Sequence, residues 1–431
     1  MNAVFFAMVA IAFAVAAVRQ VAWVAPAANP DAAAPMAALG TAMIDAAGGA
    51  VTLAIGLVGV MALFLGLMKV AEEGGLLVVI AKTVRPLMVR LFPEVPADHP
   101  AMGAMIMNMS ANVLGLGNAA TPFGIRAMEA LDKLNPVKGT ASNAMVLFLA
   151  INTSSVTILP TGVIALRAAA GSVDAAGIVP TTLFATLCST TVAIIAVKLL
   201  QGRWPMPPAE AVDTAAPVEE MAAEMLPDHA SAAYPLWVSV AVLAGIAALV
   251  PLTVLHGRAV APWIIPGLMT GLLLYGAVKR VSIYECFVEG AKDGFQVALR
   301  IIPYLVAILV AVAMFRASGA LDLLIRPLGT VTEAFGLPAD ALPMALLRPL
   351  SGSGAYGILA SIIQDPAIGP DSFTGYLVST FQGSTETTFY VLAVYFGAVG
   401  IRRIRHALVA ALLADAAGIA GAVVAVNWLY G

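Results

Sequence analysis

The chain has 431 residues, of which 61% are hydrophobic and only 11% are charged. Soluble domains are usually about 45–50% apolar and about 25% charged, so this composition excludes a soluble globular protein and indicates a polytopic membrane protein. A net charge of −3 and the lack of a basic stripe with interleaved aromatic residues give no reason to expect a nucleic-acid partner. The two cysteines, Cys188 and Cys286, form neither a metal-ligand spacing nor a disulfide framework.

The N-terminal region, residues 1–47, is predicted to hold one membrane helix and one interfacial segment. Residues 3–18 are apolar and end at Arg19. A cleaved signal within residues 1–28 is the alternative, but no Lys or Arg precedes the apolar run, which favours a retained helix. Residues 29–47 are rich in alanine and weakly amphipathic, and we expect them to lie at the membrane surface.

A first repeat is predicted over residues 48–200. It begins with a span over residues 50–69 and an amphipathic interfacial helix over residues 76–92. Residues 100–131 then combine polar residues with Gly115, Gly117 and Pro122, a density of helix breakers that indicates two half-helices joined at a turn. Such a re-entrant hairpin is tolerated at membrane depth only where protein buries it.

Two further spans complete the first repeat. Residues 141–166 form a span that is interrupted by Asn152-Thr-Ser-Ser155 and by Pro160. Residues 178–199 form the next span. Residues 201–235, which carry six acidic residues among several prolines, are predicted to be a solvated cytoplasmic linker without a core of its own.

The second half of the chain is predicted to contain two connecting spans within residues 236–294 and a second repeat over residues 295–431. The connecting spans are placed at residues 236–255 and 260–279, followed by an interfacial segment at residues 284–296. The second repeat begins with a span over residues 297–315. An amphipathic segment over residues 320–335 and a second hairpin around residues 348–357 follow.

Local sequence recurs between the two repeats. Asn135-Pro136 and Gly139 match Asp365-Pro366 and Gly369 at an offset of 230 residues. The same offset places Asn152-Thr-Ser-Ser155 on Gln382-Gly-Ser-Thr385. With three spans in each repeat and two between them, equivalent elements lie five crossings apart, an odd number, which predicts inverted repeats.

The distribution of Lys and Arg predicts the orientation. With the N-terminus in the cytoplasm, sixteen of the 22 basic residues face the cytoplasm, five face outward and Arg348 lies within the membrane. This agrees with the rule that cytoplasmic loops are enriched in positive charge. We therefore expect a bacterial inner-membrane protein of about nine spans, with its N-terminus in the cytoplasm and its C-terminus in the periplasm.

The most polar stretch in the apolar part of the chain is Gln382-Gly-Ser-Thr-Glu-Thr-Thr388. Buried in hydrocarbon without partners, each such polar group would cost several kcal/mol, so the stretch is expected to face the protein interior or a water-filled cavity. Glu386, Arg348 and Asp415 are the ionisable residues predicted deep in the membrane. The first repeat has Val156 and about Ile106 in place of the first two, so these charges are not needed to hold a shared fold. A structural Arg348–Glu386 pair is the alternative to a functional role.

These motifs resemble known families. Residues 108–122 and 152–157 resemble spore maturation protein A, whereas residues 347–357 and 383–390 resemble spore maturation protein B, so the chain resembles a fusion of the two. Both belong to the nucleoside-recognition or Gate domain, which is similar to concentrative nucleoside transporters and also occurs in ferrous-iron transporters. The resemblance implies an all-α fold of two inverted repeats, each with a re-entrant hairpin and a partly unwound helix. The Gly-Gln-Thr-Glu hairpin signature of the nucleoside carriers is absent here.

The favoured function is secondary transport of a small polar solute, for which a nucleoside-like compound is the first candidate, by alternating access. A non-enzymatic membrane scaffold in envelope or spore-type maturation is the alternative, and an intramembrane hydrolase lacks a deep nucleophile–base pair. No cofactor or catalytic residue is expected; Na⁺ and H⁺ are the candidate coupling ions, and the solute, the lipid bilayer and further copies of the chain are the candidate partners. The predicted solute-binding residues are Asn108, Ser110, Asn112, Asn118, Asn152, Thr153, Ser154, Ser155, Arg348, Ser351, Ser353, Gln382, Ser384, Thr385 and Glu386. The candidate Na⁺ ligands are Asn152, Ser155, Thr157, Thr385 and Glu386, whose oxygens suit a hard cation, although Ser, Thr and Asn also act as glue between helices.

Overall fold

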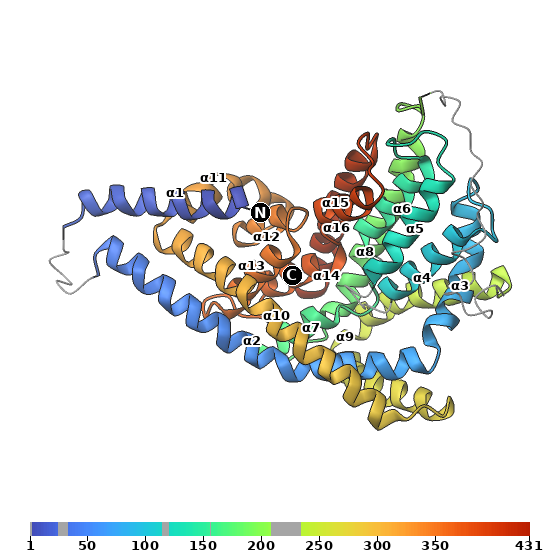
Figure 1. The fold of residues 1–431 in the computed structure, drawn as a ribbon. Coiled ribbons are helices and arrows are strands. Elements are labelled where there is room, and N and C mark those ends of the chain that lie inside the picture. The colour runs from blue at the N-terminus through green and yellow to red at the C-terminus, as the bar shows by residue number, and fades with distance from the viewer. Residues whose placement is uncertain (1, 25–32, 114–119, 156, 208–233) are drawn as a thin grey trace.

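The computed structural model describes residues 2–24, 33–113, 120–155, 157–207 and 234–431. Within these residues the chain is almost entirely helical, and its one β-type contact is an isolated bridge between Thr140 and Arg403. The all-α architecture predicted from the sequence is therefore confirmed, and apolar helices with few charges identify an integral membrane protein (Figure 1).

The helices of the first half begin with α1 and continue through α8. Their bounds are α1 (Asn2–Val21), α2 (Pro35–Glu73), α3 (Leu76–Leu91), α4 (Pro100–Val113), α5 (Thr121–Lys133), α6 (Asn143–Ser154), α7 (Thr161–Ala169) and α8 (Ile178–Leu200). The expected half-helices of the first hairpin are α4 and α5, and the expected broken span is α6 followed by α7. The hairpin tip, residues 114–119, lies outside the described residues, as does most of the acidic linker.

The second half repeats this order after one long helix, α9 (Leu236–Val278). The remaining bounds are α10 (Ile283–Ala317), α11 (Ala320–Thr332), η3 (Glu333–Phe335), η4 (Ala339–Ala341), α12 (Leu342–Leu347), α13 (Gly352–Gln364), α14 (Phe373–Ser384), α15 (Thr388–Ala398) and α16 (Ala407–Tyr430). The helices α6 and α14 both have 12 residues and begin 230 residues apart. The helices α5 and α13 likewise both have 13 residues.

Three predicted boundaries are wrong because single helices run through them. The helix α2 is continuous over the expected break near residue 48, and α10 joins the predicted interfacial segment to the span that follows it. The helix α9 has 43 residues and replaces the two predicted connecting spans. An isolated glycine weakens a helix by about 1 kcal/mol without ending it, so α2 continues through Gly48 and α9 continues through Gly257. The count of five crossings between equivalent elements therefore does not by itself establish the relative orientation of the halves.

The same local signals start the two broken helices. Gly139 and Gly369 precede them with φ of +73° and +75°, a conformation that favours glycine. Ser142 and Ser372 then cap α6 and α14, since each side chain accepts the backbone N–H three residues later. Identical capping at equivalent positions explains why the two helices begin 230 residues apart, α6 two residues after the predicted start of its span.

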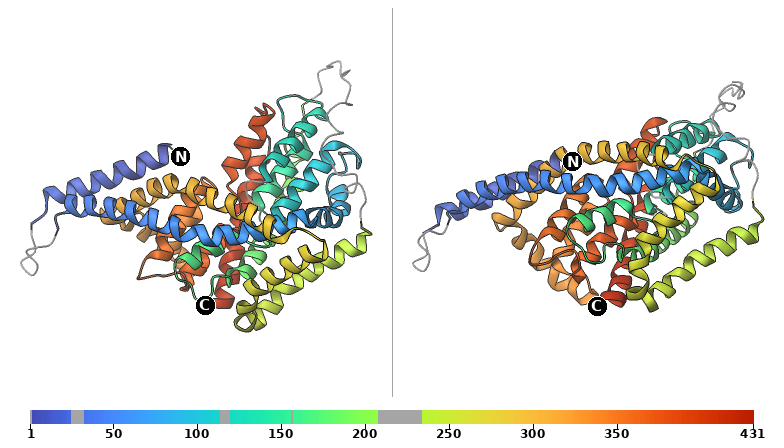
Figure 2. Two further views of the ribbon diagram at one scale, coloured as in Figure 1. Left: turned by 60° about the horizontal axis from the view of Figure 1, so that its bottom comes forward. Right: turned by 90° about the horizontal axis from the view of Figure 1, so that it is seen from below.

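The longest contact in the fold joins α2 and α10, which run side by side along one edge of the molecule (Figure 1). Glycines allow this approach: a Cβ at Gly290 would lie 2.5 Å from the Leu65 carbonyl oxygen, and one at Gly294 would lie 2.6 Å from the Ala62 Cα. Small residues are common at contacts between helices in a bilayer. Burial of apolar surface contributes little to helix association there, so close packing must supply it. In both views of Figure 2, α9 lies at the periphery of the molecule.

Three described helices are long and apolar enough to cross a membrane: α2, α8 and α16. Shorter apolar helical stretches, residues 5–21, 143–154, 265–278 and 305–317, add candidates for partial crossings. The helices α8 and α16 pack against each other at the centre of the fold and against the broken helices α6 and α14. The helices α8 and α16 therefore support the broken helices α6 and α14.

Candidate functional site

Each broken helix stops at a short irregular segment. The helix α6 ends at Ser154 and is followed by Ser155, whose φ is +45°, and α7 begins at Thr161 after Pro160. The helix α14 ends at Ser384 and is followed by Thr385 in extended conformation, and α15 begins at Thr388. The residues that interrupt α14 are the polar stretch singled out in the sequence. Gln382 and Glu386 are four residues apart but do not share a helical face, because the chain between them leaves the helix at Thr385.

The two breaks meet each other. The Glu386 backbone N–H donates to the Thr153 carbonyl oxygen at 2.8 Å, so a carbonyl freed by the first break is satisfied by the second. Each break also contacts the hairpin of its own half: the Ile158 N–H donates to Val113, and the Phe389 N–H donates to Pro349. Four interrupted elements thus converge on one place, here called the crossing: residues 153–155, 157–158 and 384–388 with the ends of α4 and α12.

The broken helices cross in opposite directions. The start of α6 lies beside the end of α15, since the Arg402 and Arg403 N–H groups both donate to the Gly139 carbonyl oxygen at 2.9 Å. At the other end, the segment after α7 lies beside the start of α14, since the Val173 N–H donates to Asp371 at 2.8 Å. The helices α6 and α14 therefore enter the crossing from opposite ends of the molecule.

Arg167 holds the second of these ends together and was not predicted to do so. Its side chain is fully buried and donates to the Pro370 carbonyl oxygen at 2.6 Å and to the Asp371 carboxylate at 3.0 Å. Its guanidinium also lies 4.3 Å from the centre of the Tyr376 ring, which stacks on Tyr430 at 3.8 Å. A charge this deeply buried is stable only when such partners surround it.

Arg405 plays the equivalent part at the opposite end. It has a φ of +50° and donates to the carbonyl oxygens of Trp204 and Ala141 at 2.9 and 3.0 Å. The neighbouring His406 is buried against the Trp204 ring. Burial, with a smaller effect from the Arg405 charge, lowers the pKa of His406 to about 4.

Arg348 links the second hairpin to the second break. Its Nη1 donates to the Thr387 hydroxyl at 3.0 Å, and its Nη2 donates to the Thr385 carbonyl oxygen and lies 3.7 Å from Glu386 Oε2. The two partners differ in exposure: the side chain of Arg348 is 5% exposed and that of Glu386 is 44% exposed. The geometry gives Arg348 a structural role at the break and leaves Glu386 with a free face.

An amide and hydroxyl network links the first hairpin to the first break. Asn112 donates to Asn152 Oδ1 at 2.9 Å, and the Tyr395 hydroxyl lies 3.4 Å from the same oxygen. Asn108 donates to the Ala120 carbonyl oxygen and to Tyr395 at 2.9 and 3.1 Å. Tyr395 belongs to α15, so this network connects the hairpin of the first half with the broken helix of the second.

Several predicted solute-binding side chains bond to their own helices. Ser110, Thr153, Ser154 and Ser384 donate to carbonyl oxygens three or four residues earlier, and Ser351 caps α13. Ser353 is exposed, whereas Gln382 is buried with its Oε1 lacking a partner among the described residues. Asn118 lies outside the described residues. The predicted residues that hydrogen-bond or pair with other elements at or beside the crossing, through side chain or backbone, are Asn108, Asn112, Asn152, Thr153, Ser154, Ser155, Arg348, Thr385 and Glu386.

The candidate Na⁺ ligands fall into two groups. The Ser155 and Thr157 hydroxyls lie 2.6 Å apart at the first break, and Asn152 is one turn away. At the second break, the Arg348 guanidinium donates a hydrogen bond to the Thr385 carbonyl oxygen and lies beside the Glu386 carboxylate. A cation beside that guanidinium would be repelled, so oxygens of the first break fit Na⁺ better than those of the second in this conformation.

Sequence reasoning missed Tyr395, Thr387 and Thr186. The Thr186 hydroxyl of α8 donates to the carbonyl oxygens of Ser154 and Ser155, which the break leaves without helical partners. Asp415 was recognised as a deep ionisable residue but not assigned to the site; it accepts a hydrogen bond from Thr388 at 2.6 Å. Polar residues within α8, α15 and α16 at the depth of the breaks were the signal that could have found them.

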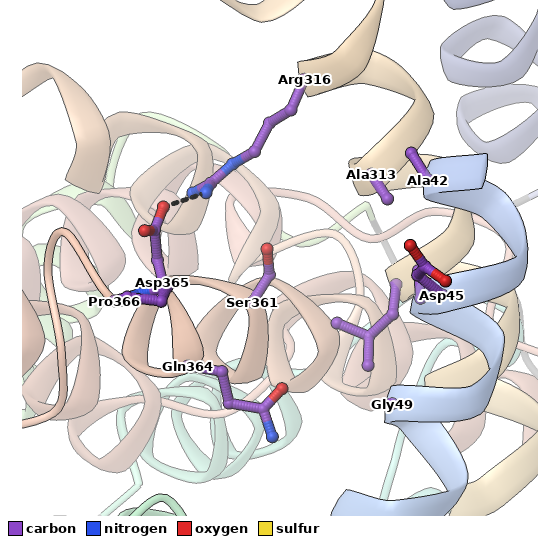
Figure 3. Close-up of a pocket in the computed structure, with 11 residues that line it drawn as sticks. Ala42, Asp45, Gly49, Ala313, Arg316, Ser361, Gln364, Asp365 and Pro366 are labelled. Carbon is purple, nitrogen blue, oxygen red and sulfur yellow. Dashed lines mark hydrogen bonds and ion pairs between the residues drawn. The ribbon is translucent and has the colours of Figure 1, made fainter. Parts of the chain in front are cut away.

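A pocket of about 430 Å³ lies away from the crossing, between α2, α10 and the end of α13 (Figure 3). Arg316 of α10 pairs there with Asp365, and Asp45 of α2 lies on the far wall. None of the predicted solute-binding residues lines it. Size alone does not make this pocket the site.

Comparison with known proteins identifies relatives for both halves. A family model described as nucleoside recognition, Gate, matches residues 54–170 and 298–402. Spore maturation protein B of Bacillus subtilis (strain 168) is 50% identical over 167 residues, which cover 39% of this chain and 93% of that protein. Spore maturation protein A of the same organism is 50% identical over 146 residues, which cover 34% of this chain and 74% of that protein. The two relatives match different parts of the chain, as a fusion would.

A solved structure also matches. CNTnw in an inward-facing substrate-bound state superposes with a TM-score of 0.44 at 13% sequence identity, over 88% of this chain and 74% of that chain.

Proposed function

Since the chain belongs to the nucleoside-recognition (Gate) family and joins regions similar to spore maturation proteins A and B, we propose that it is a secondary transporter of a small polar solute. The family description makes a nucleoside-like compound the first candidate for that solute. The solute would bind at the crossing.

The observation that carries the proposal is the contact between the two breaks. A passive membrane anchor has no need of two interrupted helices whose freed backbone groups meet, because each unsatisfied group in hydrocarbon costs several kcal/mol. Here the Glu386 N–H satisfies Thr153, and the Glu386 carboxylate keeps 44% of its side chain exposed. A half-exposed carboxylate among buried polar groups can accept hydrogen bonds from hydroxyl or amine groups of a solute.

The proposed mechanism is alternating access about inverted repeats. The opposite directions of α6 and α14 support an inverted relation between the halves. The hydrogen bonds of Arg167 and Arg405 would hold the two ends of the broken helices together while these helices move. We place the N-terminus in the cytoplasm and the C-terminus in the periplasm of a bacterial inner membrane, on the distribution of basic residues. Na⁺ at the first break or H⁺ would couple the transport.

A membrane scaffold in envelope or spore-type maturation is the second candidate. The names of the two Bacillus relatives favour it, since both are called spore maturation proteins. A scaffold would use the same helices for assembly with other proteins or with further copies of this chain, and it would bind no solute at the crossing.

Ligand-induced stabilisation separates the two candidates. Thermal unfolding of the purified protein would be measured with nucleosides, amino acids and dipeptides, each with and without Na⁺. Transport predicts that one class raises the unfolding temperature in the wild type and fails to do so in Glu386→Gln. A scaffold predicts no stabilisation by any class, together with normal maturation of cells that carry Glu386→Gln.

A further inference from the structure

Asp415 is a buried carboxyl that no element of the proposed solute site requires. It lies on α16 one turn before Gly418 and is 3% exposed. Its Oδ2 accepts from the Thr388 hydroxyl at 2.6 Å, whereas its Oδ1 is buried without a partner among the residues that the structure describes. An ionised carboxylate in an apolar interface needs more than one hydrogen bond to remain charged.

The surroundings of Asp415 supply only one positive charge. The Arg348 guanidinium interacts with it electrostatically, but the hydrogen bonds of Arg348 go to Thr385 and Thr387, and its ion pair is with Glu386. The other titratable groups on the helices packed against α16 are Cys188 and Lys198 of α8, Tyr376 of α14, and Tyr390 and Tyr395 of α15. Lys198 lies nine residues beyond Ser189, which contacts Ala414, and its ammonium group donates to the Leu91 carbonyl oxygen at 3.3 Å, away from Asp415. The helix α6 carries no ionisable side chain. One guanidinium therefore faces two carboxyl groups, and Glu386 holds it.

The first half has no carboxyl at the equivalent place. The helices α8 and α16 begin at residues 178 and 407, and this offset of 229 places Thr186 on Asp415. Thr186 donates to carbonyl oxygens of the first break, as a hydroxyl can, whereas Asp415 contacts Thr388 beside the second break. A neutral side chain is thus sufficient for the fold at this position in the first half, and the carboxyl group is present in the second half alone.

We propose that Asp415 is a proton-binding site, protonated while Arg348 pairs with Glu386. The Thr388 hydroxyl fits both states, because a hydroxyl can donate to the carboxylate or accept from the carboxylic acid. When a solute engages Glu386, Arg348 becomes available to Asp415, which then ionises and releases its proton. The exchange of one guanidinium between two carboxyl groups couples the proton to the solute. This coupling rests on the proposed transport function, whereas the protonation of Asp415 does not.

Infrared spectroscopy of the reconstituted protein tests the protonation directly. The wild type should show at neutral pH the carbonyl stretch of a protonated carboxylic acid, and Asp415→Asn should lose that band. Glu386→Gln should weaken the band at the same pH, since Arg348 then has Asp415 as its remaining carboxylate. Thr388→Val keeps Asp415 and removes its partner, so the band should shift in frequency even if Asp415→Asn does not fold.

Two results would overturn the proposal. One is a pair of infrared spectra in which the wild type and Asp415→Asn do not differ, whether or not both contain a protonated-carboxyl band. The other is a carboxylate signal of Asp415 that persists across neutral pH and responds to Na⁺, which would make the position a cation site. Because the band is read without any solute, its presence with no flux of any compound would refute transport while leaving the proton site standing.

Discussion

The Arg348–Glu386 pair provides the sharpest mutational test, because the structure gives its two members different roles. Arg348→Met leaves the Thr385 carbonyl and the Thr387 hydroxyl without their donor. An unsatisfied buried group costs about 1–3 kcal/mol, so the loss of two such bonds predicts a decrease of about 2–6 kcal/mol in the free energy of unfolding. Glu386→Gln keeps the backbone bond to Thr153 and most of the side-chain shape.

The charge interaction itself should be small. Two unit charges about 3.7 Å apart, the separation of Arg348 Nη2 and Glu386 Oε2, interact by about 1 kcal/mol in water and about 4.5 kcal/mol at an effective dielectric constant of about 20. The Glu386 side chain is 44% exposed, which favours the lower value. Glu386→Gln should therefore cost less than about 1 kcal/mol of stability while abolishing solute binding.

A double-mutant cycle measures both quantities. Unfolding of Glu386→Gln, Arg348→Met and the double variant would be followed in detergent, with solute binding measured on the same samples. The account predicts a coupling energy of about 1 kcal/mol and no recovery of binding in the double variant. Equal destabilisation by the two single variants, with stability and function both restored in the double variant, would show that the pair only locks the structure.

Three further predictions concern the far ends of the broken helices, where His406 and Arg167 lie, and the interface between α2 and α10. The low pKa of His406 means that the unfolded chain binds its proton more readily, so stability should fall as pH decreases from about 6.5 to about 4, and His406→Gln should flatten this dependence in thermal scans; an unchanged dependence would contradict it. Arg167→Met should lower the unfolding temperature strongly, whereas Arg402→Met, at an exposed position, should not; equal effects would remove Arg167 from its structural role. Gly290→Ala should disrupt the α2–α10 contact, where its Cβ would lie 2.5 Å from the Leu65 carbonyl oxygen, and Gly271→Ala on α9, with nothing within 4 Å, is the matched control; a Gly290→Ala variant as stable as the control would contradict the close packing.

The interruptions of helices were predictable because their causes are local. Gly, Pro and capping Ser residues act within a few positions, so the starts of α6 and α14 and the division of each hairpin into two half-helices follow from short motifs. The continuity of α2, α9 and α10 was not predictable in the same way. Whether a helix continues through a glycine depends on the contacts of its neighbours, which short motifs do not contain.

The contacts of the site were less predictable because they join distant residues. Tyr395 and Asn108 are 287 positions apart, and Arg167 and Asp371 are 204 apart. The sequence indicated that Asn108 and Arg348 needed partners, but not which ones. The polar character of the second break could be read directly, and the meeting of the two breaks at Thr153 and Glu386 could be expected only from the repeat.

Counterflow in proteoliposomes tests the central claim most directly. Vesicles that contain the purified protein and an excess of unlabelled nucleoside would be diluted into labelled nucleoside, with amino acids and dipeptides run in parallel, and the transient accumulation of label would be recorded. The account predicts accumulation for one solute class with the wild type and none with Glu386→Gln reconstituted at the same density. Equal, background-level signals from both proteins for every solute class would contradict transport at the crossing.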